Sequence, residues 1–123
     1  MEKILIIGCK NTMDNVCIAC SRCMVAFNKR DGEFSRYKDN DAELIGILNC
    51  GGCPGVSVVT RLAQMACWNA QNGEKATKIH IAACILDHCP EKETIINKIK
   101  AKTAIEVIEG AHTHNYKPEG LFA

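Results

Sequence analysis

The segment LIGILNCGGCPG (Leu44–Gly55) decides the fold, because it predicts a strand, a tight turn and a helix start in succession. Its first part, Leu44–Leu48, is a continuous apolar run, which is typical of a strand covered on both faces in a parallel sheet. The glycines that follow allow a tight turn, and Pro54 suits the first turn of a helix. We therefore expect a strand, a cysteine-containing loop and a helix.

The same alternation extends over the chain. Further apolar runs predict three more strands, at Ile4–Ile7, Ile79–Ala83 and Ala104–Ile108. Helical periodicity or helix-end signals predict helices over about 13–30, 54–72 and 90–102. The longest connection is the polar stretch Asn28–Glu43. This order predicts one α/β domain over residues 1–123, a three-layer Rossmann-like or flavodoxin-like fold whose four-stranded, mainly parallel sheet has helices on both faces.

Composition excludes several functions. The 123 residues carry a formal charge of +1 and only six aromatic side chains, so neither a basic surface nor stacking platforms favour nucleic acid as a partner. No apolar run approaches the ~18 residues that span a bilayer, and Ile4–Ile7 is shorter than the ~7 residues of a signal-peptide core. We expect a soluble cytoplasmic protein that does not bind membranes.

Nine cysteines and four histidines are the unusual feature of the composition. An odd cysteine count without an export signal argues against a disulfide framework and favours metal or redox chemistry. Cysteines or histidines follow each predicted strand: Cys9, Cys50, Cys53, Cys84, Cys89, His112 and His114. In a parallel sheet these positions share the carboxyl edge, where open α/β sheets bind ligands.

Of all the cysteines, the pair Cys50 and Cys53 can support the widest range of reactions. Two thiols at this spacing can chelate one metal ion or form a disulfide. If Pro54 begins a helix, Cys53 lies at the helix cap, where backbone N–H groups and the helix dipole favour thiolate. Cys89-Pro90 repeats the arrangement after the third strand.

The other cysteines and histidines are less specific. Cys17, Cys20 and Cys23 have a spacing also found in iron–sulfur proteins. Cys20 and Cys23 belong to an apolar stripe with helical spacing, which instead favours a helix. On that helix Cys17 lies nearest the start and the expected site. Packing explains Cys20, Cys23 and Cys67 at least as well as a site does. His80 alternates with strand isoleucines and is interpreted as structural, whereas His88 has no preferred role.

Several motifs resemble the CGGC-domain family of small cysteine-rich proteins from bacteria and archaea. They are Cys9 with Thr12, the paired Cys17 and Cys23 before Phe27, the CGGCPG loop, Ala83-Cys84, Cys89-Pro90, and Gly110 with His112. The resemblance implies a metal site without an established reaction, and it favours His112 as a ligand. Glu91 and Ala111 stand where the family pattern has histidine and threonine, which weakens the case for His88.

Two functions remain open. One is a metal site, either zinc or an iron–sulfur cluster, used in metal or sulfur handling. Its candidate ligands are Cys9, Cys17, Cys23, Cys50, Cys53, Cys84, Cys89 and His112. The alternative is a thiol–disulfide oxidoreductase that uses Cys50 and Cys53. Phosphate-binding glycine motifs are absent from the sequence, which excludes dinucleotide-binding and P-loop enzymes, but the sequence does not decide whether the chain is an enzyme and names no protein partner.

Overall fold

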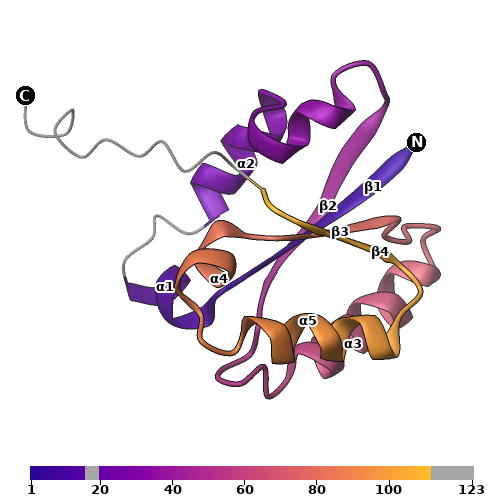
Figure 1. The fold of residues 1–123 in the computed structure, drawn as a ribbon. Helices are drawn as coiled ribbons and strands as arrows, with labels where there is room; N and C mark the ends of the chain where they lie inside the picture. Colours follow the sequence, from indigo (N-terminus) through magenta and orange to yellow (C-terminus); the bar gives the residue numbers. More distant parts are fainter. Residues whose placement is uncertain (16–19, 112–123) are drawn as a thin grey trace, which may run out of the picture.

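The computed structural model describes residues 1–15 and 20–111 (Figure 1). Its elements are β1 (Glu2–Gly8), α1 (Lys10–Asn15), α2 (Cys20–Asn28), the 3₁₀ helix η1 (Gly32–Tyr37), β2 (Ala42–Asn49), α3 (Val58–Ala70), β3 (Lys78–Ile81), α4 (Ala83–His88), α5 (Lys92–Lys102) and β4 (Glu106–Glu109). The strands and the main helices alternate along the chain, as the apolar runs predict.

The four strands form one parallel sheet in the order β2-β1-β3-β4. This confirms the predicted α/β class and adds the strand order, which the sequence did not provide. The central strands β1 and β3 are buried over Ile4–Ile7 and Ile79–Ile81, and His80 is the one polar side chain in these two ranges. Continuous burial of this kind requires cover on both faces of the sheet.

Two apolar cores lie on opposite faces of the sheet, because alternate residues of a strand point in opposite directions. On one face, Leu5 and Ile7 pack with side chains of α3, α4 and α5. On the other, Ile4 and Ile6 pack with α2 and η1. Figure 1 shows α2 on one side of the sheet and α3 and α5 on the other. The expected three layers are therefore present.

The polar connection Asn28–Glu43 contains η1, which the sequence analysis did not identify. Phe34 and Tyr37 lie three residues apart, a spacing that eclipses side chains on a 3₁₀ helix, and both are buried in the second core. The Arg30 guanidinium donates hydrogen bonds to the carbonyls of Phe27, Tyr37 and Ala42, which closes the connection onto β2. What appears polar in sequence thus contributes to the core.

The helix boundaries differ from the prediction in three places. The chain expected as one helix over 13–30 contains α1 and α2, and residues 16–19 between them lie outside the described part. The helix expected from Pro54 begins only at Val58, and that expected from Pro90 begins at Lys92. An additional short helix, α4, follows β3 directly, so that Ala83 belongs to this helix and not to the strand. Among the described residues, no helix is long and apolar enough to cross a membrane.

Candidate functional site

The chain leaves the four strands at one edge of the sheet. Backbone hydrogen bonds join the first residue beyond a strand to the adjacent strand. The N–H groups of Cys50, Ala82 and Gly110 donate to the carbonyls of Gly8, Ile7 and Ile81, respectively, each over 2.9 Å. Cys9 follows Gly8 directly. The predicted meeting of the segments after the strands at the carboxyl edge is therefore observed.

Cys9 and Cys84 are directly connected. The backbone N–H of Cys9 donates a hydrogen bond to the sulfur of Cys84 over 3.1 Å. Cys9 follows β1, and Cys84 lies in the first turn of α4, after β3. The strands β1 and β3 are neighbours at the centre of the sheet. The connection after β1 leads outward to the edge strand β2, whereas the connection after β3 leads outward to the other edge strand, β4. Such a switch point is where open α/β sheets leave a ligand-binding crevice.

The loop after β2 places its two cysteines in different environments. Cys50 is buried in the core formed with α3 and α5, whereas Cys53 is exposed. Gly51 has a φ of 77°, and a side chain there would overlap the Ser57 hydroxyl. Gly51 N–H also donates to the Asn49 side chain over 2.8 Å. The loop is therefore tightly folded at Gly51 and presents Cys53 to solvent.

The expectation that Cys53 caps a helix is wrong. Gly55 has a φ of 82°, outside the helical region, and its N–H donates to the Gly52 carbonyl in a turn. The helix α3 starts after this turn, with Ser57 at its N-cap position. The Cys53–Pro54 peptide bond is cis. The proposed activation of Cys53 by a helix N-terminus consequently has no structural basis.

Cys89 is also not at a helix start. It follows the last residue of α4 and lies at the C-cap, where the helix dipole opposes negative charge. Burial raises the pKa of the Cys89 thiol above its ordinary value, and the Glu91 backbone N–H partly offsets this effect. The negative charges of ionised Cys53, Cys9 and Cys50 raise the same pKa further. These three cysteines are therefore close enough to Cys89 to interact electrostatically.

The remaining predicted ligands are separate from this group or undescribed. Cys23 is buried in the second core beside Phe27. Cys84 also packs, partly buried, against this core, but its hydrogen bond with the Cys9 backbone keeps it within the group at the carboxyl edge. Cys17, His112 and His114 lie outside the described residues, as do the side chains of Cys20 and His88. Cys67 is exposed on α3, which excludes the packing role considered for it.

The carboxyl edge thus gathers five thiols, those of Cys9, Cys50, Cys53, Cys84 and Cys89. Within residues 1–15 and 20–111, no three cysteine, histidine or acidic side chains are arranged as a ready metal-binding group. The chemistry of the donors fits a soft metal ion, because thiolates are the preferred ligands of zinc, copper(I) and iron–sulfur clusters. Their side chains are near one another but not in coordinating positions.

Comparison with known proteins places the chain in a family. The CGGC-domain family model matches residues 3–112, which include the four strands, except for the first residue of β1, and the loop from Cys50 to Cys53. The chain belongs to the CGGC-domain family. An uncharacterized protein of Methanocaldococcus jannaschii is 33% identical over 118 residues, covering 90% of this chain and 87% of that protein. No solved structure matches the chain significantly.

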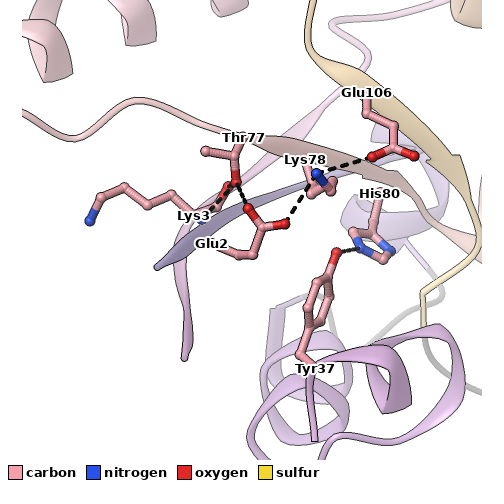
Figure 2. Close-up of polar contacts among 7 residues, drawn as sticks. All are labelled: Glu2, Lys3, Tyr37, Thr77, Lys78, His80 and Glu106. Atoms are coloured by element: carbon pink, nitrogen blue, oxygen red, sulfur yellow. Dashed lines mark hydrogen bonds and ion pairs between the residues drawn. The ribbon is translucent and has the colours of Figure 1, made fainter. Parts of the chain in front are cut away.

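This CGGC-domain chain also holds a buried polar network beside the site. His80 in β3 is fully buried, and its Nδ1 lies 2.7 Å from the Gly110 carbonyl. Because a carbonyl only accepts, Nδ1 donates, and the neutral ring then accepts from the Tyr37 hydroxyl at Nε2, also over 2.7 Å (Figure 2). The two contacts join η1, β3 and the chain after β4.

The network fixes the start of the segment that follows β4. Besides the contact of His80 with Gly110, Glu33 N–H donates to the Ala111 carbonyl over 2.8 Å. In the CGGC domain this segment leads to His112, the predicted histidine ligand. The strand pattern predicts a structural role for His80, whereas the only sequence signal for Tyr37 is its spacing from Phe34 inside a polar stretch. Burial lowers the pKa of His80, which favours its neutral form.

Proposed function

We propose that this CGGC-domain chain binds a soft metal, as a zinc ion or an iron–sulfur cluster, through thiolates at the carboxyl edge of the sheet. The observation that carries the proposal is that cysteines from three different strand ends approach one another there. A packing role predicts scattered cysteines and does not account for Cys53, which is exposed. Membership of a family with the same CGGC loop supports the proposal.

The principal ligands in this proposal are Cys9, Cys50, Cys53, Cys84 and Cys89. They exceed the four donors of a tetrahedral zinc site, which favours a cluster or a zinc site with an exchangeable ligand. Cys53 is the best candidate for the exchangeable position, because it is exposed on a glycine-rich loop while Cys50 is buried. Cys17, Cys23 and His112 complete the candidate set.

The raised pKa of Cys89 bears on how a metal binds. A metal ion needs thiolate, whereas burial and, to a smaller extent, repulsion from neighbouring thiolates hold the pKa of Cys89 above its ordinary value. A bound cation would cancel this repulsion and release the proton. Metal affinity is therefore expected to weaken as pH falls, and a role in metal or sulfur handling is consistent with such reversible binding.

A thiol–disulfide oxidoreductase that uses Cys50 and Cys53 is the second candidate. The exposed Cys53 suits an attacking nucleophile, and the buried Cys50, three residues earlier, suits its resolving partner. Against this function, α3 begins five residues after Cys53, so the helix start that activates such thiols is missing. An oxidoreductase mechanism also gives no role to Cys9, Cys84 and Cys89.

Alkylation of anaerobically purified protein distinguishes the two functions. Zinc-loaded or cluster-containing protein is treated with iodoacetamide before and after chelation, and modified cysteines are identified by mass spectrometry. A metal site predicts that Cys50, Cys53 and at least one of Cys9, Cys84 and Cys89 become reactive only after chelation. Visible absorption of the protected form indicates iron–sulfur, because d¹⁰ zinc has no such transitions.

The oxidoreductase predicts a different pattern. Chelation leaves every thiol as reactive as before, and mild oxidation removes only Cys50 and Cys53 from the reactive pool, reversibly with a dithiol. That result contradicts the metal proposal. Exposed Cys67 is the internal control, because its reactivity stays constant under both functions.

A further inference from the structure

A cavity of about 300 Å³ lies on the α3 and α5 face of the sheet, away from the cysteines of the carboxyl edge. Its apolar lining includes Leu5 of β1, Leu62 and Met65 of α3, and Ile105 just before β4. Ala76, which precedes β3, also lines it. Residues that precede β3 and β4 lie at the amino edge, whereas the cysteines follow the strands. The cavity is therefore at the other end of the sheet from the candidate metal site.

The cavity has a clear structural origin. Near the carboxyl edge, α5 is tied to the loop before α3, because Lys98 donates to the Pro54 carbonyl over 3.1 Å and Ile95 packs closely on Gly55. Toward the amino edge, α3 presents the small side chains Ala63 and Ala66 to the cavity. Small side chains at this end of α3 leave the space between the helices and the sheet unfilled.

The cavity mouth is positively charged. Lys75, after α3, and Lys102, at the end of α5, both line the cavity and are exposed. Neither lysine has an ion-pair partner among the described residues. The lining carboxylate of Glu74 is instead paired with Lys3 over 2.7 Å, so it repels an anion less than an unpaired carboxylate would. An apolar interior with two unpaired cations suits a ligand with an apolar body and an anionic end.

We propose that this cavity binds a small apolar carboxylate, with its hydrocarbon part against Leu5, Leu62 and Met65 and its carboxylate between Lys75 and Lys102. A water-sized group occupies about 30 Å³ in a liquid, so the cavity holds about ten non-hydrogen atoms. A straight-chain carboxylate of the size of octanoate fills that space. The inference is independent of the metal proposal, since no cysteine lines the cavity.

Nuclear magnetic resonance titration of the reduced, ¹⁵N-labelled full chain tests the inference with octanoate and octan-1-ol as probes. Octanoate is expected to produce saturable shifts centred on Leu62, Ala66 and Ala76. Charge reversal by Lys75→Glu with Lys102→Glu weakens octanoate binding by about two- to tenfold, as expected for exposed ion pairs, and leaves octanol binding within about twofold. Lys100→Glu, on the same helix but outside the lining, changes neither.

A variant that fills the cavity supplies the second arm. Ala66 is exposed, so Ala66→Trp is expected to fold while it removes saturable binding of both probes. The inference is overturned if octanoate does not saturate, if its shifts centre on the cysteines of the carboxyl edge, or if charge reversal affects both probes alike. It is also overturned if sedimentation shows dimers that Ala66→Trp dissociates, because the cavity then belongs to an interface between copies.

Discussion

At the scale of single residues, Cys53 and Cys67 form a matched pair. Both are exposed, and α3 carries Cys67 while Cys53 lies in the loop before it. We expect Cys53→Ser to reduce zinc affinity at least about tenfold, measured by competition with a chromophoric chelator. Cys67→Ser is expected to leave affinity unchanged, and both variants to keep their free energy of unfolding within about 0.5 kcal/mol, because surface substitutions rarely cost more. Equal losses of affinity would show that Cys53 is not a ligand.

Cys89 tests whether the thiols of the carboxyl edge are close together. Because burial and neighbouring thiolates raise its pKa, the rate of Cys89 alkylation should reach half its maximum at a higher pH in the folded metal-free chain than in the denatured chain. Cys53→Ser removes one repelling charge and should lower that midpoint. Cys67→Ser provides the control. A midpoint that Cys53→Ser leaves unchanged would contradict the electrostatic contact between the two thiols.

At the scale of elements, the CGGC loop depends on glycine at position 51. Gly51→Ala combines a positive φ with overlap of the Ser57 hydroxyl, whereas Gly73→Ala has a similar φ of 73° and open space around it. Gly73→Ala should therefore cost about 1 kcal/mol in free energy of unfolding, and Gly51→Ala clearly more. Urea denaturation measures both. Equal costs would mean that the loop relaxes around the added methyl group.

The buried His80, which links η1, β3 and the residue after β4, makes the free energy of unfolding depend on pH. Burial lowers the pKa of His80, while the unfolded chain protonates it below about pH 6.5. Unfolding then takes up a proton, so stability falls as pH decreases from about 7, by at most about 1.4 kcal/mol per pH unit. Tyr37 does not titrate in this window, because burial raises its pKa to about 12.

The comparison with His80→Gln isolates this contribution from the other histidines. The variant should be less stable at pH 7, since it disrupts a buried network, and its stability should change less between pH 7 and 5. Charged neighbours of His80, namely Arg36, Glu33 and Glu106, remain in both proteins. Urea denaturation across this range gives the difference. Parallel curves would mean that His80 is protonated in the folded chain.

The elements also show what sequence can reveal. Apolar runs such as Ile4–Ile7 predict strands well, because burial on both faces requires continuous apolar residues. The starts of helices are predicted less accurately. Pro54 indicates a helix start at that residue, but Gly55 has a positive φ and the helix begins only at Val58. Ser57, a favourable N-cap residue type, was the signal that could have corrected this boundary.

At the scale of the whole molecule, the position of the candidate site followed from topology alone. Parallel strands end at one edge whatever their order, so Cys9, Cys50 and Cys84 could be expected together. Their individual environments could not, because they depend on long-range packing. Cys50 is buried by α3 and α5, and the Cys84 sulfur meets the Cys9 backbone, through contacts between segments distant in sequence, while Cys89 lies at the C-cap of α4, a helix that the apolar runs did not predict.

If metal joins loops from several strands, it should stabilise the whole molecule. A ligand that binds only the folded chain raises the free energy of unfolding by about 2.7 kcal/mol at a hundredfold excess over its dissociation constant. Zinc is expected to raise the urea midpoint of reduced protein, and magnesium is not, because thiolates are poor ligands for hard cations. The gain should shrink as pH falls and thiolates are protonated.

The variants Cys53→Ser and Cys67→Ser separate this stabilisation from nonspecific binding of zinc to thiols. Zinc that binds any accessible cysteine stabilises both variants equally, and binding to the unfolded chain reduces the gain in both. A site at the carboxyl edge predicts a smaller gain for Cys53→Ser and an unchanged gain for Cys67→Ser. If zinc leaves the midpoint of the unsubstituted chain where it was, the cysteines of the carboxyl edge do not form a common metal site.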